Sequence, residues 1–207
     1  MLENYSKDEL GVIHQINKKP FIYDTEYVEV RYKTIPAIVS YMSYLRLGYI
    51  YNSIPRFTSL LDVGFGSGDF LKAVQNYTLN VSGYDVFYNE NLPEGASRIA
   101  SLVDNYYDII TFFDSLEHFD SLDFVKQLQC NYIVVSVPWC HYLNDDWFEN
   151  WKHRRPDEHL HHFNHDSLIN FMKFSGYKII TYSDVEDIIR KPTDNLPNIL
   201  TAIFKKE

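Results

Sequence analysis

Three glycines at alternate positions mark the stretch DVGFGSG, residues 62–68. Gly64, Gly66 and Gly68 follow a short apolar run in which Asp62 is the single acid. Glycines cluster where the backbone takes positive φ angles or where a ligand approaches it closely. A strand, a glycine-rich turn and a helix N-terminus together form a cradle for the nucleoside part of a cofactor. The sequence therefore predicts a nucleoside-binding turn at residues 62–68.

The spacing of these glycines separates two classes of cofactor. A nicotinamide dinucleotide site has the pattern G-x-G-x-x-G, whose third glycine lets the helix pack closely on the strand. Counted from Gly64, that third position is Asp69, so a nicotinamide-dependent oxidoreductase is the less favoured alternative. An aspartate beside exposed backbone amides instead suits a ligand with an ammonium and a carboxylate. Asp85, at the end of the next predicted strand, stands where an acid binds ribose hydroxyls.

The segment DSLEH, residues 114–118, combines two acids with an imidazole. Oxygen ligands and one imidazole suit a hard divalent cation, so one interpretation assigns Asp114, Glu117 and His118 to a metal site. The favoured interpretation is that no metal binds here and that His118 is a catalytic residue. The requirement for a divalent metal stays open at this point.

A second group of imidazoles lies in the long polar segment between residues 141 and 165. Such a segment can bind a transition metal. We favour packed or solvated histidines, with His159 and His162 as hydrogen-bond partners of a substrate. Trp139 and His141 are expected to line the acceptor pocket, with His141 as a base near neutral pH. The alternative for Trp139 is that it anchors the loop to the core.

Alternating strand and helix patterns supply the framework that must position these side chains. Short β-rich runs are expected at 59–63, 80–86, 98–103, 107–113, 132–139, 177–185 and 198–206, with helices at 68–77, 120–129 and 165–176. This order is typical of a parallel sheet with crossover helices. We predict an α/β Rossmann-like three-layer sandwich with a seven-stranded, mostly parallel sheet whose last strand is antiparallel.

The N-terminal part of the chain has a different pattern. Residues 1–57 are predicted to form a cap or lid that includes an amphipathic helix, and residues 58–207 the cofactor-binding domain. Tyr32, in this cap, is a candidate for the substrate pocket.

Composition narrows the range of partners and compartments. The 207 residues carry a formal net charge of −9, which argues against nucleic acid because phosphate binding depends on lysine and arginine. No apolar run has the length of a membrane span, and the first residues do not resemble a signal peptide. Two cysteines cannot make a disulfide framework. We expect a cytoplasmic monomer or homodimer that binds a small-molecule acceptor and neither membrane nor nucleic acid.

Four segments in order resemble the class I S-adenosylmethionine-dependent methyltransferases. LLDVGFGSG with GYDV is similar to the first motif and the acidic motif of that family, and YDIITFFDSLEHF to its fourth-strand motif. IVVSVP continues the resemblance to the family, and EHLHHFNHDSLINFMKFSGY is similar to the segment before the sixth strand in a small-molecule branch. The sequence departs from that branch before the fifth strand, where QLQCNY stands in place of a Lys-Pro-Gly-Gly turn.

The resemblance implies a set of cofactor contacts. Asp62 and the backbone around Gly64 and Gly66 would hold the methionine part, and Asp85 the ribose. The remaining residues that the resemblance assigns to the cofactor are Phe65, Gly68, Val86, Ser101, Leu102, Phe113 and Asp114.

The same resemblance implies the reaction. The cofactor would be S-adenosylmethionine and its product S-adenosylhomocysteine. We expect methylation of a small molecule, at oxygen in preference to nitrogen, with a sugar or cell-envelope precursor as one substrate class. The alternative is a catalytically idle cofactor-binding subunit that acts through a protein partner.

Overall fold

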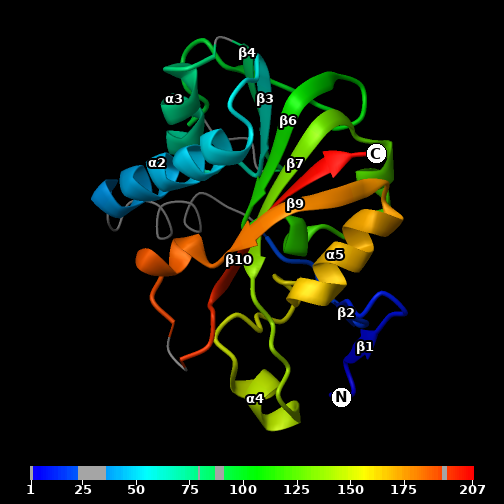
Figure 1. Cartoon of the computed structure of the whole chain (residues 1–207). Helices are drawn as coiled ribbons and strands as arrows, with labels where there is room; N and C mark the ends of the chain where they lie inside the picture. Colours follow the sequence, from blue (N-terminus) through cyan, green and yellow to red (C-terminus); the bar gives the residue numbers. More distant parts are fainter. Residues whose placement is uncertain (1, 23–35, 79, 87–90, 193–194) are drawn as a thin grey trace.

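The computed structural model of the chain, which describes residues 2–22, 36–78, 80–86, 91–192 and 195–207, is built around a seven-stranded sheet (Figure 1). The strands lie in the order β5-β4-β3-β6-β7-β10-β9. Their bounds are β3 Ser59–Val63, β4 Asn80–Tyr84, β5 Ser97–Arg98, β6 Tyr106–Phe113, β7 Gln129–Pro138, β9 Tyr177–Ser183 and β10 Ile199–Lys206.

The strand directions confirm the predicted fold class. β3 is parallel to β4 and β6, and β6 is parallel to β7, whereas β10 is antiparallel to both β7 and β9. The chain leaves β3 for β4 on one side and later returns to β6 on the other side. Ligands in open α/β sheets bind beyond the carboxyl ends of the strands at such a reversal.

Helices cover both faces of the sheet (Figure 1). α2 (Pro36–Ser53) and α3 (Asp69–Gln75) lie on one face, and α5 (His165–Phe174) lies on the other. Neighbouring residues of β3 point to opposite faces, so Leu60 belongs to the apolar cluster of α2 and α3 while Leu61 belongs to that of α5. Every residue of β3 is buried, as expected for a central parallel strand.

A small second sheet was not predicted from the sequence. β1 (Tyr5–Lys7) pairs antiparallel with β2 (Ile13–Gln15), which pairs antiparallel with β8 (His161–His162). The N-terminal strands therefore pack against the histidine-rich segment, and α2 alone of the described N-terminal elements lies near the glycine turn. The division into units 1–57 and 58–207 stays a prediction.

Several predicted elements are shorter than expected or of another type. The helix expected at 120–129 is a 3-10 turn, η2 (Asp123–Gln127), and the third strand has only two residues. The remaining described elements are η1 (Leu116–His118), α4 (Asp145–Asn150) and η3 (Val185–Ile188). None of the described helices is long and apolar enough to cross a membrane.

Candidate active site

The glycine turn joins the end of β3 to the start of α3. Gly64 has a φ of 80°, and a Cβ atom there would lie 2.6 Å from the Cβ of Ser115. Ser115 is fixed in place because its hydroxyl donates to the carbonyl of Val63 at 2.6 Å. Gly68 has a φ of 73°, and a Cβ atom there would lie 2.1 Å from the backbone oxygen of Asn91. Both conformations favour glycine, so the spacing is required by the shape of the turn.

Asp85 connects the glycine turn to the next strand. It follows β4, and its Oδ2 accepts a hydrogen bond from the backbone N–H of Gly66 at 3.0 Å. Gly66 itself has a φ of 50°. The two acids predicted from the sequence thus stand at the carboxyl ends of adjacent strands, on either side of the turn.

Asp62 is buried below the turn, with 3% of its surface exposed. Thr111 on the neighbouring strand β6 donates to its Oδ1 at 2.6 Å. Burial raises the pKa of Asp62 to about 6, although the Thr111 hydrogen bond and the charge of Arg46 oppose that rise. The carboxylate is therefore ionised at neutral pH and ready to accept a positively charged partner.

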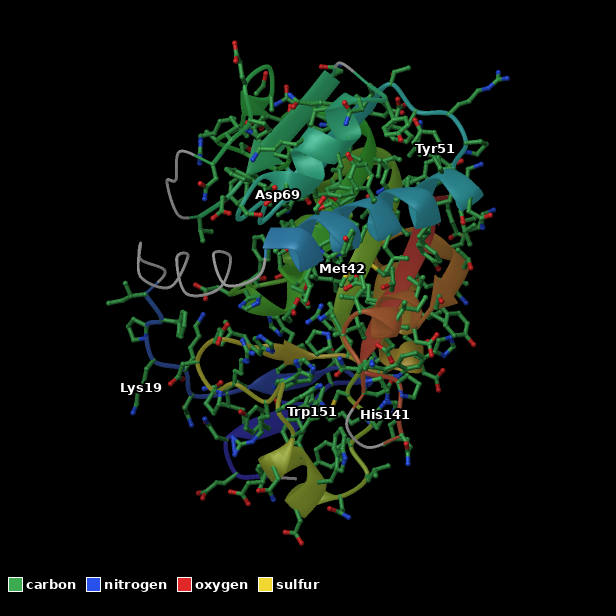
Figure 2. All side chains as sticks on the ribbon, turned by 90° about the vertical axis from the view of Figure 1, so that its left-hand side faces the viewer. Lys19, Met42, Tyr51, Asp69, His141 and Trp151 are labelled. Carbon is green, nitrogen blue, oxygen red and sulfur yellow. The ribbon has the colours of Figure 1, made fainter. Side chains whose placement is uncertain are left out.

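A cavity of about 330 Å³ extends from the glycine turn to the histidine-rich segment. Asp62, Gly64, Phe65 and Ser67 line it on the turn side. The rest of the lining comes from α2, from the start of α3, from the ends of β6 and β7, from η1 and from later loops: Ile38, Val39, Met42, Ser43, Arg46, Phe70, Phe113, Asp114, Glu117, His118, Pro138, His153, Arg155, His159 and Arg190. Figure 2 shows α2, with Met42, lying next to the start of α3 at Asp69.

Four charged side chains from three parts of the chain make a network at the cavity: Arg46 in α2, Asp114 after β6, and Glu186 with Arg190 near η3. Arg46 donates to Asp114 Oδ2 at 2.8 Å and to Glu186 Oε1 at 2.7 Å. Arg190 donates to Asp114 Oδ1 at 2.6 Å and to Glu186 Oε2 at 3.2 Å. Ser136 adds a hydrogen bond to Glu186 Oε1 at 2.7 Å.

The network determines the charge of its members. Burial alone would raise the pKa of Asp114, but Arg190 and Arg46 hold it well below its usual range. Burial alone would lower the pKa of Arg46, but Glu186 and Asp114 raise it. Asp114 and the two arginines therefore stay charged at neutral pH. Asp114 also has a φ of 55°, which directs the chain out of β6 into η1.

Glu117, His118 and His159 form the end of the cavity next to β8. The imidazole rings of His118 and His159 lie edge to face, with 4.7 Å between their centroids. Burial raises the pKa of Glu117 well above its usual value, and the charge of Asp114 adds to that effect. Burial, followed by the charge of His118, lowers the pKa of His159 to about 2, so this imidazole is neutral.

The cavity brings together some of the residues predicted from the sequence. Its lining includes Asp62, Gly64, Phe65, Phe113, Asp114, Glu117, His118 and His159. Among the described residues, it does not include Gly66, Gly68, Asp85, Val86, Ser101, Leu102, Trp139, His141 or His162. Tyr32 lies outside the described residues. The roles of all these residues stay predictions.

Trp139, His141 and His162 lie in aromatic clusters away from this lining. The His141 ring stacks on Trp139 at 5.6 Å, and His141 Nε2 lies 2.7 Å from the carbonyl oxygen of Pro197. In Figure 2, His141 is well separated from Asp69 at the glycine turn. His162 is 3% exposed and packs on Phe148, and burial lowers its pKa to about 3. Of the two predicted catalytic histidines, His118 is the one among the lining residues.

Sequence reasoning missed the charged wall of the cavity. Arg46, Glu186 and Arg190 lie in segments whose patterns indicated only a helix and a turn. His153 and Arg155 also line the cavity, and burial lowers the pKa of His153 to about 4. The one indication in the sequence was Arg46, in the middle of the predicted amphipathic helix, because an arginine that becomes buried needs a partner.

Comparison with known families agrees with this geometry. Residues 38–182 match the model of a family described as a methyltransferase domain, and the chain belongs to that family. The match begins in α2 and ends in β9, so it contains the glycine turn, Asp85 and the cavity wall at Glu117. A search of curated protein sequences found no match.

Solved structures share the fold at low identity. A methyltransferase from Haloferax volcanii, solved in complex with its Trm112 activator, is 10% identical, with a TM-score of 0.65 over 90% of this chain and 99% of that one. A S-adenosylmethionine-dependent methyltransferase from Clostridium acetobutylicum is 12% identical, with a TM-score of 0.62 over 87% and 98%. Magnesium protoporphyrin IX methyltransferase from Synechocystis, solved with bound S-adenosylhomocysteine, is 11% identical, with a TM-score of 0.58 over 91% and 90%.

These comparisons confirm S-adenosylmethionine as the cofactor of this fold. The residues present fit that molecule. The positive φ angles of Gly64 and Gly68 shape a tight backbone turn beside the cavity. A buried carboxylate, Asp62, and an acid after β4, Asp85, stand where an ammonium and a ribose need acceptors.

Proposed function

We propose that the protein is an S-adenosylmethionine-dependent methyltransferase that methylates a small molecule, at oxygen in preference to nitrogen. One observation carries the proposal: a single cavity joins the glycine turn and Asp62 to a wall of imidazoles and arginine. Its volume of about 330 Å³ is in the range of small-ligand sites, which are roughly 300–1,000 Å³. A sugar or cell-envelope precursor is the substrate class that we put forward first.

In this proposal the glycine-turn side holds the cofactor. Asp62 accepts the ammonium of the methionine part, and the backbone of the turn lies along it. Asp85 takes the ribose hydroxyls while its Oδ2 keeps the Gly66 amide in place. Val86, Ser101 and Leu102 flank the adenine. The cofactor supplies a methyl group that is already activated by the positive charge on sulfur.

The charged network shapes the part of the cavity where the methyl group would lie. Arg46 and Arg190 neutralise Asp114, so this acid positions the two guanidinium groups. The guanidinium of Arg46 also lies over the ring of Phe113, 4.4 Å from its centroid. These contacts fix α2 relative to the end of β6. A rigid wall of this kind aligns donor and acceptor and excludes water, which supplies most of the rate in a displacement of this type.

The acceptor would occupy the imidazole end of the cavity. A hydroxyl oxygen held there would take the methyl group that the cofactor supplies, and the hydroxyl would have to lose its proton. The hydroxyl proton passes to His118 or to solvent. His159 and His153 are neutral imidazoles and offer hydrogen bonds to the hydroxyl groups of a polar acceptor. Arg155 adds a cation at the same end.

Calorimetric titration of S-adenosylhomocysteine tests the proposal. We expect micromolar binding to the wild-type protein and at least tenfold weaker binding to Asp85→Ala, a loss of about 1.4 kcal/mol or more. Asp146→Ala is the matched control because Asp146 is an exposed aspartate on α4, outside the lining of the cavity. Absence of binding to the wild type, or equal affinity in the Asp85 and Asp146 variants, would overturn the assignment.

The alternative is a cofactor-binding subunit that is idle without a protein partner. The Haloferax volcanii neighbour, solved with an activator protein, supports keeping this alternative. The two readings differ in one result: turnover of any small acceptor by the isolated chain excludes the idle subunit. Cofactor binding that is never followed by turnover until a second protein is added would favour it.

A further inference from the structure

Glu117, His118 and His159 meet at one end of the cavity although they come from different segments. Glu117 and His118 lie in η1, directly after β6, and His159 lies shortly before β8. The backbone N–H of Leu160 donates to the carbonyl of Glu117 at 2.8 Å, which ties the two segments together. One side-chain donor atom from each of the three residues lies within 4.8 Å of the other two. His118 Nε2 lies 3.9 Å from Glu117 Oε1.

The burial of Glu117 lacks an explanation in the contacts of the described residues. Its side chain is 1% exposed, and neither carboxylate oxygen has a hydrogen-bond partner among them. The Nδ1 atom of His159 is likewise buried without such a partner. Buried polar atoms are nearly always hydrogen-bonded, and a carboxyl group without a partner costs free energy. A cation is the partner that would serve the carboxylate and the imidazoles at once.

We propose that Glu117, His118 and His159 bind a divalent transition-metal ion of the Zn²⁺, Mn²⁺ or Co²⁺ class. One carboxylate with two imidazoles suits these ions, whereas Mg²⁺ and Ca²⁺ prefer oxygen ligands. Two donor atoms that bind one ion can lie at most about 4.2 Å apart, so the cluster closes on an ion by a contraction of less than about 1 Å. The three ligands leave coordination positions that face the cavity.

This ligand set differs from the one considered from the sequence alone. Asp114 is held by Arg46 and Arg190 and is not part of the cluster, and His159 stands in its place. The role of the ion rests on the proposed function. An ion at this end of the cavity would lower the pKa of an acceptor hydroxyl, and the released proton would go to solvent. His118 then acts as a ligand instead of the base.

Metal titration of the untagged 207-residue chain, first freed of metal with a chelator, tests this proposal. We expect MnCl₂ and ZnCl₂ to bind at one ion per chain, and CoCl₂ to give a visible absorption band of a nitrogen-ligated ion. Glu117→Gln keeps the shape of the side chain and removes its charge, so affinity should fall at least tenfold. His159→Asn is a second variant, from the other segment, and should show the same loss. His165→Asn is the matched control and should bind like the wild type, since His165 lies outside the cluster.

The outcomes separate this inference from the proposed function. The metal site is refuted if the wild type binds no ion, or if Glu117→Gln and His159→Asn bind as tightly as His165→Asn. S-adenosylhomocysteine is titrated into the same metal-free samples. Cofactor binding without metal binding would refute the metal site and leave the proposed function standing. Metal binding without cofactor binding would support the metal site and refute the proposed methyltransferase function.

Discussion

The two walls of the cavity are built in different ways. The glycine-turn wall comes from one continuous stretch, residues 62–68, whose shape depends on positive φ angles and close backbone contacts. The charged wall comes from Arg46, Asp114 and Arg190, which belong to three separate segments and are held by ion pairs to one another and to Glu186. The first wall is local and depends on the backbone. The second exists only after the chain has folded.

This difference predicts where each wall is vulnerable. A change in the charged wall should cost stability, because it leaves a buried charge without its partner. A change in the glycine turn should cost stability and should also alter the cofactor site.

Removal of Glu186 should have the largest effect. Its side chain is 0% exposed and pairs with both arginines, so Glu186→Ala leaves two largely buried guanidinium groups, whose side chains are 13% and 27% exposed, to share Asp114. We expect the free energy of unfolding to fall by about 3–5 kcal/mol. Urea denaturation measures this value. Glu149→Ala is the matched control, since its side chain is 59% exposed and its change should be within about 0.5 kcal/mol. A loss below about 1 kcal/mol at Glu186 would show that the network does not hold this wall together.

Alanine at Gly64 should have a smaller effect on stability and a clear effect on the cofactor. The φ of 80° and the 2.6 Å approach to Ser115 predict a loss of about 1–3 kcal/mol and weaker binding of S-adenosylhomocysteine. Gly48→Ala is the control, because nothing lies within 4 Å of a Cβ atom there and the residue lies within α2. That variant should be more stable than the wild type by about 0.5–1 kcal/mol. Equal behaviour of the two variants in denaturation and calorimetry would contradict the account of the turn.

The pH dependence of cofactor binding should show the smallest effect. The pKa of Asp62 is raised to about 6, so this carboxyl group becomes protonated as the pH falls below that value. A ligand whose ammonium needs the ionised form must then bind less tightly. Affinity for S-adenosylhomocysteine should fall about tenfold between pH 7 and about pH 5. In Asp62→Asn, binding should be weak and nearly independent of pH over this range. An unchanged affinity of the wild type would mean that Asp62 does not meet the ammonium.

The sequence predicted the parts of the molecule that depend on local pattern. Strand–turn–helix alternation gave the sheet and its antiparallel last strand, because parallel strands need crossover segments of recognisable length. The glycine spacing and Asp62 were also recognised from the sequence, because they lie within one continuous stretch of the chain. The helix expected at 120–129 was wrong: the apolar spacing that predicted an α-helix is used in a single 3-10 segment, Asp123–Gln127, directly before β7.

Contacts between distant segments could not be read from the pattern. Nothing next to Arg46 in the chain reveals that Glu186 is its partner. The pairing of β2 with β8 depends on how the long segment between residues 141 and 165 folds back against the N-terminal strands. The histidines of that loop looked alike in the sequence. The fold places His159 in the cavity lining, whereas His162 packs among aromatic rings and His141 stacks on Trp139.

A crystal structure of the protein grown with excess S-adenosylhomocysteine tests the central claim most directly. The account predicts that the ligand lies in the cavity between the glycine turn and α2, with its amino-acid end at Asp62 and its ribose at Asp85. Density for the ligand at another place, or a cavity that stays empty at saturating concentration, would contradict the account.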